Sequence, residues 1–303
     1  MKTPIPLLTP LCLALLAFTS PARAHDSSDS DGPGGNGASA PARIVELEAR
    51  TALTSPVVGG SGLAAGIPSA TTIPTGPGGA AALEAENVDG KTSAEVTVRT
   101  RGLAADTYTV AVTKKSDHSS ITLGTFVIVP VITPALAAGR ANESSPRQGS
   151  IEFETGGKNP LPAGFDGFDV ATISVSASNG NVVLAGDFTT SVDRVTRVKL
   201  SPPPVTPTET AVVVTPPVAS GFASIFSRTR AGVTTSSFVL TARGLPASAA
   251  LTLALNGADV QPAPTDVRGR LRIHSLPATV DIAAIKTVAI HDAVAAVLLS
   301  GSF

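Results

Sequence analysis

The chain has 303 residues, of which 43% are hydrophobic and 15% charged, with 22 Lys and Arg against 23 Asp and Glu. With this balance the sequence has no excess of positive charge of the kind that binds nucleic acid or an acidic membrane surface. The 25 prolines and 28 glycines disfavour long helices, whereas short alternating runs of Val, Thr, Ile and Ala favour strands. The composition therefore predicts an all-β protein with much turn and loop.

Residues 1–24 have the three zones of a cleavable secretory signal peptide. Lys2 supplies a short positive region, an apolar stretch culminates in residues 11–18, and residues 22–24 (Ala-Arg-Ala) form the cleavage site. The apolar stretch is too short and too rich in proline to span a membrane, and no later run approaches the ~20 apolar residues that a span needs. We therefore expect an exported protein, periplasmic or extracellular, with no transmembrane span.

Cleavage of the signal would change the chemistry of the chain. The only cysteine, Cys12, and the only methionine would be lost, so no disulfide could form after export. A lipid anchor would need a cysteine directly after the cleavage site, so none is expected. Without Lys2 and Arg23, 20 basic residues would face 23 acidic ones, a net charge of about −3.

Residues 25–78 form a low-complexity leader that we expect to be mostly disordered, because it has few large apolar side chains to bury. One strand is expected within it, at residues 44–50, where Val45 and Leu47 alternate with Glu46 and Glu48. Such a strand could cover a sheet edge or pair with a neighbour.

Two stretches of the chain recur in its second half. Residues 79–103 align without a gap on 221–245, and residues 161–188 align on 276–303 with nine identities in 28 positions. The duplication predicts two divergent sandwich units, at 79–188 and 221–303, separated by a Pro-rich linker at 189–220.

Both units show the alternation of half-buried strands. The first is expected to hold strands at 81–88, 93–101, 107–113, 121–129, 150–154, 171–177 and 181–188. The second is expected to hold strands at 221–227, 236–243, 251–255, 270–274, 286–291 and 296–303. Short strands joined by glycine-containing turns are typical of β-sandwiches.

Each unit carries Arg-Gly-Leu, then Leu-Pro-Ala, an Asp, and a closing Val-x-Leu-x-Gly-x-Phe. This pattern, over most of residues 79–303, resembles repeats in exported bacterial tandem-repeat β-sandwich (Ig-like) proteins of unassigned function. The resemblance implies two divergent tandem Ig-like β-sandwich units and an envelope location. It implies no catalytic residues.

Two places in the sequence could bind a metal ion. The new terminus, His25, could chelate copper, but His118, His274 and His291 offer no second histidine at ligand spacing, so a solvated His25 is favoured. A calcium ion could bind Asp166 with Asp169.

Only Asp166 recurs in the second unit, as Asp281. A turn-capping role is therefore favoured for Asp166 and Asp281. Tyr108 alternates with Val110 and Val112, so it is expected in the core rather than in a carbohydrate site.

The sequence therefore assigns no catalytic, cofactor-binding or metal-binding residue, and no cofactor is expected. The leading hypothesis is an exported non-enzymatic structural or adhesive protein of the cell envelope or exterior. The alternative is a periplasmic protein that binds a small ligand or metal, and an enzyme ranks third. The expected partner is another protein or an envelope component, not nucleic acid.

Overall fold

The computed structural model describes residues 42–56, 76–129, 148–203 and 218–303. All of them belong to one compact unit, residues 40–303. Every pair of named strands is antiparallel, and three short 3-10 helices, η1 to η3, lie between strands. The described residues are therefore all-β, as the composition predicted. The expected signal peptide, His25 and much of the expected leader lie outside the described residues.

The first eight strands are β1 (Arg43–Thr54), β2 (Gly78–Val88), β3 (Lys91–Arg101), β4 (Asp106–Lys114), β5 (Ser120–Ile128), β6 (Gln148–Glu154), β7 (Val170–Ser176) and β8 (Val182–Asp187). The second eight are β9 (Ser191–Leu200), β10 (Ser220–Arg230), β11 (Val233–Arg243), β12 (Thr252–Leu255), β13 (Ala258–Pro262), β14 (Leu271–Ile273), β15 (Thr287–His291) and β16 (Val297–Ser302). The 3-10 helices are η1 (Gly167–Asp169), η2 (Phe188–Thr190) and η3 (Ile282–Ala284).

The strands expected from alternation are all present, with ends shifted by a few residues. The strand expected at 44–50 is β1, which continues to Thr54 and buries Val45, Leu47, Ala49 and Leu53. Two strands were not expected, β9 and β13. β13 is short and carries a proline, which weakens the sequence pattern of a strand.

The prediction of a linker over residues 189–220 is wrong for residues 191–200, which form strand β9. Residues 191–200 pair with β10 along ten positions and with β1 along seven. Val198 and Leu200 are buried, so this segment is held by both backbone pairing and apolar burial. Of the proline-rich remainder, residues 204–217 lie outside the described residues.

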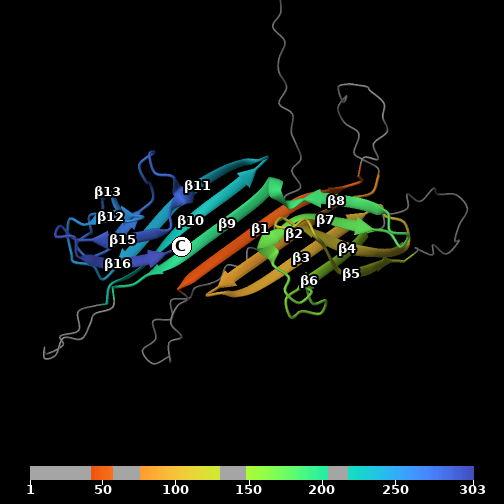
Figure 1. Cartoon of the computed structure of the whole chain (residues 1–303), viewed down its shortest axis with the longest axis horizontal. Helices are drawn as coiled ribbons and strands as arrows, with labels where there is room; N and C mark the ends of the chain where they lie inside the picture. Colours follow the sequence, from red (N-terminus) through yellow and green to blue (C-terminus); the bar gives the residue numbers. More distant parts are fainter. Residues whose placement is uncertain (1–41, 57–75, 130–147, 204–217) are drawn as a thin grey trace, which may run out of the picture. The chain divides into compact units, whose positions relative to one another are not determined.

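β1 pairs with β2 on one side and with β9 on the other, so eight strands follow one another without a break. Figure 1 shows β1, in orange, lying between β2 and β9. The order of this run is β6-β3-β2-β1-β9-β10-β11-β14. Two further rows complete the fold, β8-β7-β4-β5 and β13-β12-β15-β16.

The pairing pattern of β1–β8 recurs in β9–β16. The register shift between Val110 and Ala111 on β4 recurs between Leu253 and Ala254 on β12. The shift between β7 and β8 recurs between β15 and β16. In each set one backbone pair joins the end of the first strand to the last strand: Thr54 pairs with Ala185 of β8, and Ser201, directly after β9, pairs with Ser300 of β16.

The hairpin turns of the two sets also match. β2 and β3 are joined by Asp89 and Gly90, and β10 and β11 by Ala231 and Gly232. All four residues have positive φ, between 49° and 85°. Two-residue hairpins favour this backbone because its twist matches that of the strands, and Gly adopts it without steric cost.

Each set of strands has its own core. One cluster gathers residues of β1–β8, among them Leu83, Val96 and Phe153, and the other gathers residues of β9–β16, among them Leu240, Leu253 and Leu299. In each case the apolar sides of two four-stranded rows face one another, which gives a sandwich-like arrangement.

The contact between β1 and β9 is symmetric in register. Leu47 of β1 lies opposite Arg194 of β9. The two residues also hold the same place in their own sets of strands: Leu47 pairs with Ala85 of β2, and Arg194 pairs with Ser227, the residue of β10 that corresponds to Ala85. The flanking pairs show the same symmetry: Val45 lies opposite Thr196, and Ala49, which corresponds to Thr196, lies opposite Val192, which corresponds to Val45. The two sets therefore meet edge to edge about a local two-fold axis between Leu47 and Arg194.

Glycines allow the last strand of each set to approach the first. A Cβ on Gly186 would lie 2.9 Å from the Ala52 carbonyl oxygen, and one on Gly301 would lie 2.8 Å from that of Lys199. Ala52 and Lys199 are themselves equivalent positions. Close backbone approach therefore explains the glycine of the Val-x-Leu-x-Gly-x-Phe pattern.

We predict that Gly186→Ala and Gly301→Ala each destabilise the protein by about 1–3 kcal/mol, because the added methyl overlaps backbone that cannot move freely. Urea unfolding of each variant measures this loss. Gly76→Ala is the matched control, since a Cβ there meets nothing within 4 Å. Unchanged midpoints for both test variants would contradict the close approach.

Candidate functional site

One face of the eight-strand run is turned away from both cores, and we name it the outer face. Residues directly opposite one another in antiparallel strands project to the same side of a sheet. On β1, Val45, Leu47 and Ala49 are buried, whereas Glu46 and Glu48 between them project to the other side. The residues paired with Glu46 and Glu48 on β2 and β9 therefore also project away from the cores, and the same pairing extends this assignment to β3 and β6 on one side and to β10 and β11 on the other.

The part of the outer face formed by β1, β2, β3 and β6 carries seven carboxylates against four basic groups, and we name it the acidic half. The carboxylates are Glu46, Glu48, Glu84, Glu86, Glu95, Glu152 and Glu154. The basic groups are Arg50, Lys91, Arg99 and Arg101.

The part formed by β9, β10, β11 and β14 has the opposite composition, with six basic groups against the single carboxylate of Asp193, and we name it the basic half. The basic groups are Arg197, Lys199, Arg228, Arg230, Arg243 and Arg272. One continuous face therefore carries two fields of opposite sign.

Five carboxylates lie directly opposite one another on successive strands. Side chains in such positions are only about 5 Å apart at Cβ, and like charges there destabilise a sheet. From β6 to β9 they are Glu154, Glu95, Glu84, Glu48 and Asp193. The row ends where Arg228 lies opposite Asp193.

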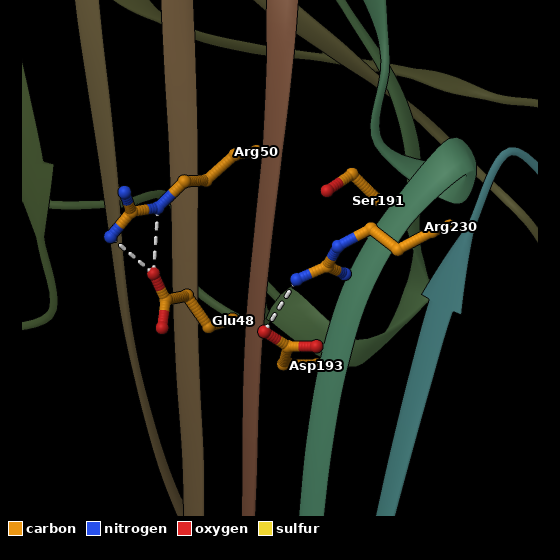
Figure 2. A pocket seen from close by; sticks show the side chains of 5 residues that line it. All are labelled: Glu48, Arg50, Ser191, Asp193 and Arg230. Atoms are coloured by element: carbon orange, nitrogen blue, oxygen red, sulfur yellow. Dashed lines mark hydrogen bonds and ion pairs between the residues drawn. The ribbon is translucent and has the colours of Figure 1, made fainter. Parts of the chain in front are cut away.

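Asp193 marks the boundary between the halves and is held by two arginines. Its carboxylate accepts hydrogen bonds from Arg228 Nε at 3.1 Å and from an Arg230 guanidinium nitrogen at 2.7 Å. On β1, Glu48 pairs with Arg50 of the same strand at 2.5 Å. Figure 2 shows the Arg50–Glu48 pair beside the Arg230–Asp193 pair.

Two open hollows adjoin Asp193. The first, of about 270 Å³, is lined by Glu48, Arg50, Ser191, Asp193 and Arg230 (Figure 2). The second, of about 440 Å³, shares Asp193 and extends over Phe226 and Arg228.

The charged groups of the first hollow already pair with one another. Its volume is also below the ~300–1,000 Å³ of small-molecule pockets, whereas the second hollow lies within that range but is open to solvent. This geometry favours contact with a broad partner over enclosure of a small ligand.

Burial of Asp193 opposes its ionisation, but the hydrogen bonds from Arg230 and Arg228 outweigh this effect, so the pKa of Asp193 lies below its usual value. The carboxylate is therefore charged throughout the neutral range and pairs with two arginines that lie on one strand.

Apolar side chains also reach the outer face. Phe222 and Phe226, both on β10, are 39% and 38% exposed. Aromatic side chains that are half exposed beside charged groups are common at protein interfaces. The basic half therefore offers apolar contact area as well as charge.

Asp166 and Asp281 cap turns, as expected. Asp166 accepts a hydrogen bond from Phe168 N at 2.9 Å at the start of η1, and Asp281 accepts one from Ala283 N at 3.0 Å at the start of η3. Asp169 instead accepts from the backbone and hydroxyl of Ser116. The capping prediction is confirmed.

The expected core position of Tyr108 is also confirmed. The side chain is 3% exposed, and its hydroxyl donates to the Ala104 carbonyl at 3.0 Å.

His118 and His274 are exposed, while His291 lies 2.7 Å from the carboxylate of Asp259, which raises the pKa of His291 above its usual value. Over residues 42–56, 76–129, 148–203 and 218–303, no group of three or more His, Cys, Asp or Glu side chains is placed to hold a metal ion. In the same ranges no helix is long and apolar enough to cross a membrane.

No match to the chain was found among family models, curated proteins or solved structures.

The outer face was not singled out from the sequence, although a signal was present. Glutamates two residues apart occur on β1, β2 and β6, as in Glu84 and Glu86, and arginines two residues apart occur on β10 at Arg228 and Arg230. Like charges at this spacing share one face of a strand. Only the strand order, however, brings the three glutamate pairs together.

We predict that Asp193→Asn destabilises the protein most at neutral pH. Because the folded-state pKa of Asp193 is depressed, its stabilising effect is present above the unfolded pKa of about 3.9 and is lost as the pH falls through the lower folded pKa. The difference in thermal midpoint between wild type and variant should therefore shrink as the pH falls from about 7 towards about 3.

Glu152→Gln, at an exposed position on β6, is the control, for which a small difference is expected. A difference for Asp193→Asn that does not change with pH would show that its ion pairs have no stabilising role.

Proposed function

We propose that the protein is an exported, non-enzymatic structural or adhesive protein of the cell envelope or exterior, and that the outer face is its working surface. The single observation that carries the proposal is this broad face, which combines opposite charges with exposed aromatic side chains. A broad, open face of this kind suits a macromolecular partner, because small ligands require concave sites that cover most of their surface.

Export and cleavage after residue 24 form part of the proposal, and the zones of residues 1–24 support them. The absence of cysteine after residue 12 fits a protein whose stability in an oxidising compartment rests on its two apolar cores.

We further propose that the chain consists of two divergent tandem units of Ig-like type. The matching registers, bulges and hairpin turns of β1–β8 and β9–β16 support the duplication. The buried Tyr108, whose hydroxyl bonds the backbone four residues upstream, supports the Ig-like type, since Ig-type sandwiches use the same device. Each unit then includes its first strand, so unit one starts at β1 and unit two at β9.

We predict that the protein appears outside the cytoplasm, shortened by residues 1–24, and is retained by the envelope fraction of its host. Phe222→Ser with Phe226→Ser should weaken retention by about tenfold, because these side chains are exposed on the working surface. Sedimentation of purified protein with envelope fragments measures retention, and cell fractionation with mass spectrometry measures export.

The matched control is Val267→Ser with Val294→Ser, which removes two apolar side chains that are 80% and 82% exposed in turns elsewhere. Retention that is equal in both double variants would contradict the assignment of the outer face. A cytoplasmic protein of full length would contradict export.

A further inference from the structure

The two halves of the outer face carry net charges of opposite sign. Seven carboxylates and four basic groups give the acidic half a net charge of −3, and six basic groups and one carboxylate give the basic half +5. A partner that covers the whole face must therefore carry both signs in the reverse order.

We propose that the outer face binds a second copy of this chain, turned about a two-fold axis so that the acidic half of each copy lies over the basic half of the other. This inference rests on the proposed function of the outer face and names its partner. A copy turned about a two-fold axis that runs along the boundary between the halves, parallel to the strands, presents the reverse order of charge, because an isologous interface brings the same patch of both chains together.

Other classes of partner fit the charges less well. A polyanion that binds the basic half would meet repulsion from the acidic half of the same sheet, and a polycation would meet the converse. The chain as a whole is close to neutral, with 22 basic and 23 acidic residues, so the separation of charge is a property of the face rather than of the composition.

The face is large enough for a stable dimer. Its six longest strands, β3, β2, β1, β9, β10 and β11, have 10 to 12 residues each. With ~4.8 Å between strands and ~3.4 Å per residue, they cover about 1,100 Å². This area exceeds the ~800 Å² per partner of a standard protein interface.

Internal repulsion on the acidic half supplies a physical reason for association. Glu48, Glu84 and Glu95 lie directly opposite one another on adjacent strands. Like charges in these positions destabilise an isolated sheet. The basic half of a second copy would offset that repulsion, while Phe222 and Phe226 would lose their remaining contact with water.

Corresponding residues of the two sets of strands carry opposite charges on this face, as the proposed dimer requires. On the core side, Leu83 of β2 is equivalent to Ile225 of β10, and both are apolar. On the outer side, Glu86 of β2 is equivalent to Arg228 of β10, and the sign of the charge is reversed. Divergence of the outer face therefore converts two equivalent surfaces into complementary ones.

Charge reversal in full-length protein tests the proposal. One variant reverses the acidic half, Glu46→Lys with Glu86→Lys, and the other reverses the basic half, Arg197→Glu with Arg272→Glu. Wild type should dimerise in sedimentation velocity over a concentration series. Each double substitution leaves the altered half with a net charge of +1, so +1 faces +5 in a dimer of the first variant and −3 faces only +1 in a dimer of the second. Each variant alone should therefore dimerise at least about tenfold more weakly.

Mixing the two variants should restore part of the dimerisation, since the unaltered basic half of the first variant (+5) then lies over the unaltered acidic half of the second (−3). Salt between about 0.15 M and about 1 M should weaken the wild-type dimer by screening. Lys158→Glu with Lys286→Glu, two exposed residues outside the strands, is the control and should leave the dimer unchanged. Urea unfolding of every variant checks that the fold is retained.

A wild-type protein that stays monomeric, or a mixture that fails to restore dimers, would overturn the inference. Envelope retention that still depends on Phe222 and Phe226 in a monomeric protein would overturn the dimer and leave the proposed function standing. If the protein dimerises as expected but the envelope fraction retains neither monomer nor dimer, the proposed function is overturned instead.

Discussion

The antiparallel pairing of β1 with β9 is the contact on which the rest of the structure depends. β1 is the first strand of one set and β9 is the first strand of the other, and each has β2 or β10 on its second side. Without the pairing, both would be edge strands with a row of unpaired backbone groups, which invite association with other chains. The pairing removes both edges at once and makes one face from two.

The pairing also explains why the face can carry charges of both signs. Packing keeps equivalent residues apolar where both pack in a core, as at Leu83 and Ile225, whereas the position of Leu47 is taken by Arg194 in the second set. Outer residues are not constrained by packing, so Glu84 can have Phe226 as its equivalent. In the full run of strands these differences add up to an acidic half and a basic half, with Asp193 and its two arginines at the boundary.

The sequence predicts strands well where one face is buried and the other is not. β2 and β3 alternate clearly because Leu83 and Val96 face a core while Glu84 and Glu95 face solvent. β9 escapes prediction because its valines do not alternate: Val195 projects to the outer face, and Arg194 projects to the core side opposite Leu47. The adjacent prolines made the whole segment resemble a linker.

The site was less predictable than the strands. Turn-capping by Asp166 depends on neighbours two residues away, so the sequence could indicate it. The outer face depends on the order of strands that lie far apart in the chain, such as β1 beside β9 and β3 beside β6. A sequence without related chains does not give that order, so the gathering of the glutamates could not be derived from it.

A cross-strand disulfide tests the β1–β9 register most directly. In a Cys12→Ser background, Glu46→Cys with Val195→Cys places two thiols at directly opposite positions, within the Cα separation that a disulfide tolerates. Glu46→Cys with Lys199→Cys places them four residues out of register, about 14 Å apart. The structure predicts rapid intramolecular oxidation of the first pair only, seen by mass spectrometry of monomeric protein. Oxidation of neither pair, or of both equally, would contradict the continuous sheet.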